Sequence, residues 1–303
     1  MNHDEWQLTI QTCQEKAKQL IERDGEITDK ETAVKLLMEE IPAALARSLA
    51  TYNGDAPLAV LFSGGVDSTF LCYLLQQAKI DFLAVTIGFQ DNPEQKLPDD
   101  ILVARKAAQK YGFTHVEKIY NFDEVEKLFQ ETVAILGSEL TNAVNVGVGS
   151  VELAAIQTAR EHNNNCSHFL GGLGSEEIYA GYKRHDDATD ITAECWNGLF
   201  GMFERDLRRD QALAQATGVT WLAPFLDPQL IVQSMRVSDT LKISDGLSKV
   251  ILREVALALG LDEEFALRPK KAAQYGSRTD RAIEKLAKKH GFTYKKDYLA
   301  SLL

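Results

Sequence analysis

The sequence lacks the cysteine and apolar patterns that mark several common classes of protein. Its four cysteines are scattered without a CxxC pair, so we expect neither a disulfide framework nor a structural zinc site, and we expect a reducing compartment. No apolar run approaches the roughly 20 residues that a membrane helix needs. The first residues are acidic and polar, whereas a signal peptide begins basic and then turns apolar. These absences predict a cytoplasmic protein.

Basic charge is also scarce. The chain has 33 Lys and Arg against 44 Asp and Glu, a formal net charge of -11. This balance argues against a protein whose main role is non-specific binding to nucleic acid or to an anionic membrane. The 303 residues suffice for one large or two ordinary domains. We find no internal repeat and no low-complexity linker.

Short apolar runs alternate with helix-like segments in the first two thirds of the chain. This alternation predicts an α/β fold with a doubly wound parallel sheet. The expected strands cover residues 58–62, 82–89, 115–122 and 166–172, with helices at 68–78, 99–111, 123–137 and 150–162.

Helical patterns flank this core on both sides. Residues 3–24 form one expected helix, and a second follows a capping-box pattern at Thr28 and Glu31. After about Tyr182, helices dominate at 190–218, 227–239 and 246–259. We therefore expect an N-terminal helical segment at 1–55 and one domain at 56–303. Within that domain the α/β core covers about 56–185 and the helical part about 186–303.

The turn SGGVDS, Ser63–Ser68, joins the first expected strand to a helix. Its two glycines let consecutive backbone N–H groups face one point, and the helix start adds partial positive charge. Ser63 and Ser68 can donate further hydrogen bonds to a phosphate. The Asp67 carboxylate could bind a Mg²⁺ that lies between it and the phosphates, because the ligands of Mg²⁺ are commonly one or two carboxylates plus phosphate oxygens.

Two well-known phosphate loops are absent. No lysine follows the glycines, as a Walker A loop would require, and the turn is not GxGxxG. The pair Gly147 and Gly149 has Glu152 where a third glycine belongs, so we interpret it as an ordinary loop. A turn without a ligand is the alternative for SGGVDS, but its sequence between a strand and a helix favours a phosphate site.

SGGVDS resembles the signature loop of the PP-loop ATP pyrophosphatases, whose fold is adenine nucleotide alpha hydrolase-like. A second motif, GLGSEEIYAGY at residues 172–182, resembles the synthetase domain of asparagine synthetase and of its relative β-lactam synthetase. Glu176 stands at the family's metal-binding aspartate, and Glu177 matches the acidic residue after it. Leu173 replaces a glutamate that is implicated in deprotonating the amine, which puts ordinary asparagine formation in doubt.

The resemblance extends over about residues 35–290. Three more segments match the family: APFLDPQLI, SKVILREVALAL and RPKKAAQYGS. The sequence of the last segment is closer to that of asparagine synthetase domain-containing proteins. The resemblance implies ATP and Mg²⁺ as cofactors, and a ligase that adenylates a carboxylate, releases pyrophosphate and forms an amide. The residues it implies for nucleotide binding are Leu61, Ser63, Gly64, Gly65, Asp67, Ser68, Ile87, Gly171 and Gly172. Asp67 and Glu176 would bind the metal, and Asp67 and Lys270 would act in catalysis.

Glutamine-dependent members of the family begin with a nucleophilic cysteine on a glutaminase domain. Here Asn2 stands second, and only residues 1–57 precede the first strand. We expect ammonia, another amine or a separate glutaminase subunit to supply nitrogen, and a homodimer stays open. The alternatives are a tRNA- or cofactor-modifying PP-loop enzyme and a nucleotide-binding protein without turnover.

The basic C-terminal segment has two interpretations. Its cations are Arg268, Lys270, Lys271, Arg278, Arg281, Lys285, Lys288 and Lys289. They could contact RNA phosphates. We favour a loop that closes over the ATP phosphates, with Lys270 facing them, followed by a solvated helix. Nucleic acid is therefore an unlikely partner and a membrane is not expected, whereas ATP, a small carboxylate and an amine are the expected ligands.

Overall fold

The computed structural model describes every residue of the chain except 53, 55, 93, 245 and 270–272. It divides into two compact units, and each unit combines three separate stretches of sequence. Unit 1 comprises 1–53, 171–205 and 222–270, and unit 2 comprises 54–170, 206–221 and 271–303. Lys270 and Lys271, two of the cations named above, lie outside the described residues.

Unit 2 contains the parallel sheet. Its strands follow the order β3-β2-β1-β4-β5, and β1 pairs in parallel with both β2 and β4, while β2 pairs in parallel with β3. The predicted α/β class with a doubly wound parallel sheet is confirmed. The chain runs outward through β2 and β3 on one side of β1 and through β4 and β5 on the other. Parallel α/β sheets bind ligands at such a change of direction.

The strands are β1 (Leu58–Leu61), β2 (Phe82–Phe89), β3 (His115–Tyr120), β4 (His168–Leu170) and β5 (Thr220–Leu222). The helices of unit 2 are α3 (Val66–Gln77), α4 (Asp99–Tyr111), α5 (Phe122–Leu140), α6 (Ala143–His162), α10 (Arg208–Thr217), α14 (Ala273–Gly276), α15 (Thr279–Lys289) and α16 (Lys295–Ala300).

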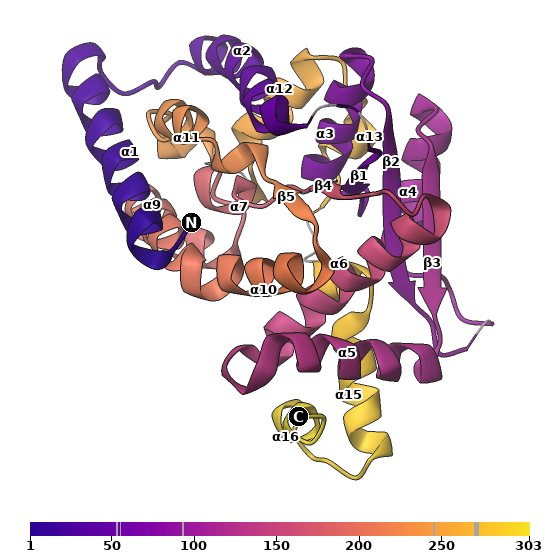
Figure 1. The fold of residues 1–303 in the computed structure, drawn as a ribbon. Coiled ribbons are helices and arrows are strands. Elements are labelled where there is room, and N and C mark those ends of the chain that lie inside the picture. Colours follow the sequence, from indigo (N-terminus) through magenta and orange to yellow (C-terminus); the bar gives the residue numbers. More distant parts are fainter. Residues whose placement is uncertain (53, 55, 93, 245, 270–272) are drawn as a thin grey trace. The chain divides into compact units, whose positions relative to one another are not determined.

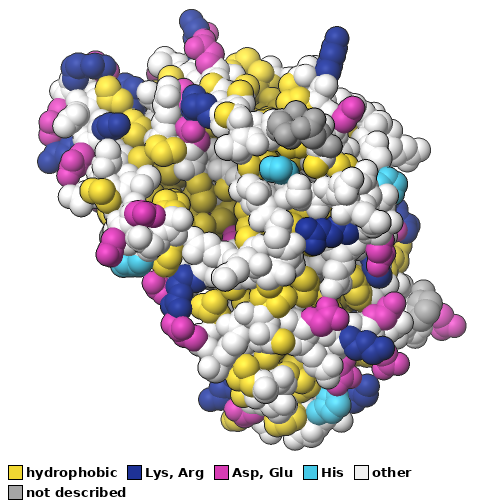
Figure 2. Space-filling view, in the orientation of Figure 1, with side chains coloured by type: hydrophobic (Ala, Val, Ile, Leu, Met, Phe, Trp, Pro, Cys, Tyr) yellow, Lys and Arg dark blue, Asp and Glu magenta, His cyan; other side chains and the backbone are white. Residues whose placement is uncertain are grey.

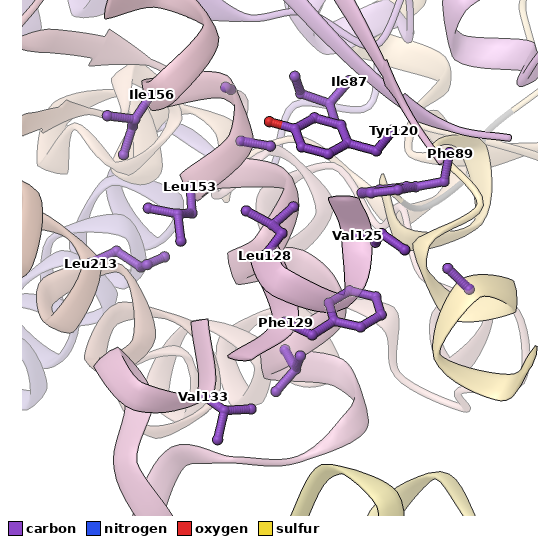
Figure 3. Close-up of a cluster of buried hydrophobic side chains, with 14 of the residues drawn as sticks. Ile87, Phe89, Tyr120, Val125, Leu128, Phe129, Val133, Leu153, Ile156 and Leu213 are labelled. Carbon is purple, nitrogen blue, oxygen red and sulfur yellow. The ribbon is translucent and has the colours of Figure 1, made fainter. Parts of the chain in front are cut away.

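Apolar side chains from β2, β3, α5, α6 and α15 form the main core of unit 2. In Figure 1, α5, α6 and α15 lie beside one another, as their mutual contacts require. Figure 3 shows Ile87 and Phe89 of β2 next to Tyr120 of β3, with Leu128 and Phe129 of α5 facing them. Burial of this apolar surface is the main force that holds the sheet to these helices.

Unit 1 is largely helical. Its α-helices are α1 (His3–Asp24), α2 (Lys30–Ser48), α7 (Ser175–Ile178), α8 (Lys183–Asp186), α9 (Ile191–Met202), α11 (Pro228–Ser234), α12 (Val250–Ala258) and α13 (Glu263–Ala266). Short 3-10 helices η1 (Leu49–Thr51), η3 (Pro224–Leu226) and η4 (Asp239–Leu241) and the hairpin strands β6 (Ile243–Ser244) and β7 (Leu247–Ser248) complete it. Trp6 of α1 is buried and its indole N–H donates to the Leu199 carbonyl oxygen at 2.8 Å.

Two local predictions were wrong. The cap of α2 is Asp29, whose carboxylate accepts the Thr32 N–H at 2.8 Å, and not Thr28. Gly147 and Gly149 lie inside α6 and not in a loop, because Asn142 caps the helix earlier by accepting the N–H groups of Val144 and Asn145. The predicted helix over 190–218 is confirmed as α9, the π-helix η2 (Phe203–Leu207) and α10 in succession. Among the described residues, no helix is long and apolar enough to cross a membrane.

Candidate nucleotide site

The turn Ser63–Gly65 follows β1 directly and leads into α3. The Phe62 N–H donates to the Val85 carbonyl oxygen at 2.9 Å, which extends the sheet ladder to the edge of the turn. Gly64 has φ +67°, a left-handed conformation that disfavours side chains. A Cβ there would also lie 2.9 Å from Val103 Cγ1 and 3.0 Å from the Ala104 nitrogen. The turn therefore needs glycine at 64 for its conformation and for its close packing on α4.

Hydroxyl groups and backbone N–H groups crowd this turn. The Ser63 N–H donates to Ser68 Oγ at 3.3 Å, and the Gly65 N–H donates to Ser63 Oγ at 3.3 Å. Within the part of the chain that the structure describes, no acceptor receives the N–H groups of Gly64 and Val66. Unpaired donors at the start of the 12-residue α3 are a suitable site for an anion. Asp67 lies in the first turn of the same helix.

The two expected adenine contacts lie in neighbouring strands. Leu61 pairs with Val85, and Ile87 lies two residues farther along β2. The Ile87 side chain is buried in the core, so only its backbone could meet a nucleotide. Between them, Thr86 donates its hydroxyl to the Phe62 carbonyl oxygen at 2.6 Å and lies 2.9 Å from His115 Nε2. Burial lowers the pKa of His115, so this contact involves a neutral imidazole.

The second glycine segment belongs to unit 1. The Gly171 N–H donates to the Leu222 carbonyl oxygen at 3.0 Å, and the Gly172 carbonyl accepts the Ser175 N–H at 3.3 Å. Gly174 has φ +99°, and a Cβ there would lie 2.4 Å from Leu226 Cδ2. These constraints fix the turn that carries the half-buried Leu173 into α7.

Glu176, one expected metal ligand, is bonded to a lysine that the sequence interpretation missed. Lys249 Nζ lies 2.6 Å from Glu176 Oε1 and donates to Ser175 Oγ at 3.0 Å. Lys249 is fully buried and has φ +57°, which costs energy for a residue with a side chain. Gly181 leaves room for the pair, since a Cβ there would lie 1.9 Å from Glu176 Oε2. The only sequence signal was the position of Lys249 in the SKVILREVALAL segment.

The neighbouring Glu177 is also paired. Its carboxylate is fully buried and accepts a hydrogen bond from Arg205 Nη2. The Arg205 guanidinium lies 5.6 Å from the centroid of the Tyr182 ring, and that of Arg184 lies 4.2 Å from it. Tyr182 is thus a packing partner of two cations.

The residues present partly fit a magnesium ion. Asp67 offers a carboxylate next to the anion site, and carboxylates are ligands that Mg²⁺ prefers. Glu176 offers a second carboxylate, whose Oε1 already accepts a hydrogen bond from Lys249. Asp67 and Glu176 belong to different units, so a shared ion stays a prediction. The described residues contain no group of three or more His, Cys, Asp or Glu that could hold a metal.

The cysteines are poor nucleophiles. All four are buried and free, and burial raises the pKa of Cys166 and of Cys195 to about 11. A thiol with such a pKa is almost entirely protonated at neutral pH, and the thiolate is the reactive form. This chemistry is unfavourable for nucleophilic catalysis by Cys166 or Cys195.

The basic C-terminal helix is largely neutralised by acidic partners. Lys285 pairs with Asp91, Lys288 with Glu284, Lys289 with Glu126 and Lys295 with Asp280. In Figure 2, dark-blue and magenta side chains are interspersed over the visible face. A nucleic-acid surface would instead present unpaired cations along one stripe.

The parallel sheet with a glycine-rich turn after its first strand defines a doubly wound α/β fold with a candidate anion site at the start of α3. The sequence model of the asparagine synthase family matches residues 40–194 and 186–293. The chain therefore belongs to the asparagine synthase family.

Individual relatives agree with this assignment. A Methanocaldococcus jannaschii protein, provisionally named asparagine synthetase [glutamine-hydrolyzing] 1, is 26% identical over 307 residues, covering 88% of this chain and 54% of the relative. The asparagine synthetase [glutamine-hydrolyzing] of Rattus norvegicus is 28% identical over 240 residues, covering 73% and 40%. The chain thus spans about half, or less, of these relatives. An NH3-dependent NAD synthetase structure from Campylobacter jejuni is 14% identical with a TM-score of 0.40, covering 90% of this chain and 93% of that one; this likeness is too distant to bear on function.

Proposed function

We propose that this protein is an ATP-dependent ligase that forms AMP and pyrophosphate while it adenylates a carboxylate for amide formation. The observation that carries the proposal is the turn Ser63–Ser68, whose N–H groups at Gly64 and Val66 have no acceptor among the described residues at the start of α3. Membership of the asparagine synthase family supports the choice of ATP and of a carboxylate as substrates.

The phosphate turn would hold the nucleotide. Ser63, Gly64, Gly65 and Ser68 donate hydrogen bonds to the phosphates, as expected for N–H and hydroxyl groups at a helix N-terminus. The backbones near Leu61 and Ile87 contact adenine, and Gly171 and Gly172, which directly follow β4 in the chain, contribute backbone contacts.

Charge on the leaving group must be stabilised during the first step. An oxygen of the substrate carboxylate forms a bond to the α-phosphorus, and the bond from that phosphorus to the bridging oxygen breaks to release pyrophosphate. Lys270 balances the charge that develops there. Asp67 and Glu176 would hold Mg²⁺, which acts as a Lewis acid on phosphate oxygens. An amine then displaces AMP from the activated carboxyl group.

Leu173 bears on how the amine substrate loses its proton. A leucine cannot remove a proton, so the amine enters as the free base or loses its proton to another group. Ammonia, a different amine or a separate glutaminase subunit as the nitrogen source all agree with this replacement. We propose a cytoplasmic location, in line with the four free thiols.

The test is pyrophosphate release from ATP and Mg²⁺ with a panel of carboxylates and amines, aspartate and ammonia among them. Asp67→Asn should abolish release, whereas Asp81→Asn, an exposed carboxylate of the same unit, should leave it unchanged. Full release by Asp67→Asn would refute the metal assignment. Release that requires RNA would favour the tRNA-modifying alternative. ATP binding without release across the panel would favour a protein without turnover.

A further inference from the structure

The phosphate turn is held to the sheet at Phe62, the residue that precedes it. The Phe62 N–H donates to the Val85 carbonyl oxygen at 2.9 Å, and the Phe62 carbonyl oxygen accepts a hydrogen bond from Thr86 Oγ1 at 2.6 Å. The first bond continues the sheet ladder, whereas the second comes from a side chain. Both partners belong to β2, so this strand sets the direction in which the chain enters the turn.

The Phe62 carbonyl and the Ser63 N–H belong to one peptide group. Such a group is planar and almost always trans, so its C=O and N–H bonds point in opposite directions. A hydrogen bond that fixes the Phe62 carbonyl therefore also fixes the Ser63 N–H, the first donor of the turn. This N–H donates to Ser68 Oγ at 3.3 Å, so it is aimed at the first turn of α3, where the candidate anion site lies.

Thr86 lies on the face of the sheet that carries the turn. Its neighbour Ile87 belongs to the core that packs on α5 and α6 (Figure 3), and side chains alternate along a strand. Gly88 faces α4, because a Cβ there would lie 2.8 Å from Ile101 Cγ1, and the turn packs on the same helix through Gly64. The Thr86 side chain is buried, so its hydroxyl needs a partner within the protein.

The hydrogen atoms around Thr86 can be assigned by counting donors. A threonine hydroxyl has one hydrogen atom, and a carbonyl oxygen can only accept. The contact of 2.6 Å with Phe62 therefore uses the Thr86 hydrogen. Thr86 Oγ1 also lies 2.9 Å from His115 Nε2, so the Nε2–H group must donate this second bond. His115 thus donates to Thr86, and Thr86 in turn donates to Phe62.

Packing fixes the ring of His115. This residue pairs with Ala84 in the register of β3 with β2, which places it on the α4 face of the sheet. Its ring lies edge-on to the Phe62 ring, with centroids 5.9 Å apart. The charged groups that act on it, Arg105 of α4 and Glu117 of β3, pair with each other. Burial lowers the pKa of His115, so the neutral ring prevails at pH 7 and its hydrogen is the one on Nε2.

We propose that Thr86 and His115 are positioning residues for nucleotide binding. The chain of hydrogen bonds from His115 through Thr86 to Phe62 orients the Ser63 N–H toward the phosphate before the nucleotide arrives. Preorganised donors bind more tightly than donors that must first be ordered. The proposal rests on the proposed function for the identity of the ligand, but it concerns the binding of ATP and not the later release of pyrophosphate.

Isothermal titration of the intact chain with ATP and Mg²⁺, without a carboxylate substrate, tests this proposal. Thr86→Val keeps the shape of the side chain but removes the donor, and should weaken ATP binding about tenfold. Thr86→Ser keeps the hydroxyl and should restore most of the affinity. His115→Met should weaken binding about fivefold, whereas His115→Gln, whose amide can donate in place of Nε2–H, should lose much less.

Thr132→Val is the matched control. Thr132 of α5 is also buried, donates to the Leu128 carbonyl oxygen at 2.8 Å and has a second polar partner, Ser150 Oγ, at 3.1 Å. Its hydrogen bonds lie within α5 and between α5 and α6 rather than at the turn. Thr132→Val should therefore lower the stability in urea about as much as Thr86→Val does, and leave ATP binding unchanged.

The double variant of Thr86→Val with His115→Met distinguishes a chain of hydrogen bonds from two separate effects. Because His115 acts through Thr86, the double variant should bind ATP as Thr86→Val alone does, and multiplied losses would overturn the proposal. Wild-type affinity in both single variants would overturn it too, as would equal losses in Thr86→Val and Thr132→Val.

The proposed ligase reaction fails in a different way. ATP binding that follows the expected ratios without any release of pyrophosphate would refute the ligase and support the positioning role. Wild-type protein that releases pyrophosphate, with Thr86→Val binding ATP equally well, would refute the positioning role alone. No binding of ATP by the wild type would overturn both.

Discussion

Replacing Glu152 with glutamine should change how the stability of this protein depends on pH. Among the described residues, Glu152 of α6 lies in a buried cluster with the cation Arg209 and the carboxylates of Asp206 and Asp210. The Arg209 guanidinium contacts all three carboxylates. Its Nη2 lies 2.6 Å from Asp210 Oδ1, its Nη1 lies 3.3 Å from Asp206 Oδ1, and its Nε lies 3.4 Å from Glu152 Oε2. Burial disfavours the charged forms of these carboxylates, which share the Arg209 guanidinium, so Glu152 should keep its proton.

The size of the effect follows from the pKa of Glu152. Burial raises this pKa from 4.5 to about 8, although Arg209 lowers it in part. The folded state therefore holds a proton between about pH 4.5 and 8 that the unfolded state releases. This contribution to stability is complete below pH 4.5 and is lost as the pH rises through 8. A difference of about 3.5 pKa units at about 1.4 kcal/mol each gives a ceiling of about 5 kcal/mol.

Urea denaturation of the wild type and of Glu152→Gln at pH 5, 6, 7, 8 and 9 measures this directly. Glutamine resembles the protonated acid, so the variant should gain on the wild type with each step up to about pH 8 and then level off. Glu131 is an exposed carboxylate on the neighbouring α5. The difference in free energy of unfolding between the wild type and Glu131→Gln should therefore stay the same from pH 5 to 9. A difference between the wild type and Glu152→Gln that does not change from pH 5 to 9 would refute the reasoning.

Three further substitutions test close contacts. Gly64→Ala should weaken ATP binding about tenfold in a nucleotide-binding assay, because the added Cβ meets Val103 at a positive φ; unchanged affinity would contradict the assigned turn. Gly181→Ala should lower the free energy of unfolding by about 1–3 kcal/mol, since its Cβ would overlap Glu176, whereas Gly201→Ala, with no atom within 4 Å, should cost little. Lys249→Met should lower the free energy of unfolding by about 3–5 kcal/mol, because it removes the cation that Glu176 faces. The double variant with Glu176→Gln should recover part of this loss in the same urea assay.

Strand positions were predictable because parallel strands buried on both faces appear as continuous apolar runs. The prediction for β2 was correct at both ends, and β1 differed by one residue at its end. Helix starts were less predictable where several polar residues compete for one cap. Thr28 and Asp29 both suit the start of α2, and only the observed hydrogen bond to Thr32 distinguishes them.

The turn at the end of β1 could be predicted because its chemistry is local. The glycines, hydroxyls and carboxylate of an anion turn are contiguous in the sequence, so spacing alone indicates them. The Lys249–Glu176 pair could not be found in this way. Its partners are far apart in the sequence, and the positive φ of Lys249 leaves no trace in residue type. The buried Glu177–Arg205 pair escaped prediction for the same reason.

The discontinuous make-up of the two units has a consequence for biosynthesis. Helix α15, whose apolar face completes the core around β2 and α6, follows β1 at a large distance in the sequence and leaves the ribosome long after it. The parallel strands thus leave the ribosome well before the helix that covers them. Non-local pairing of this kind slows folding and exposes unpaired strands to aggregation. During synthesis the exposed strands should depend on chaperones until α15 is available to cover them.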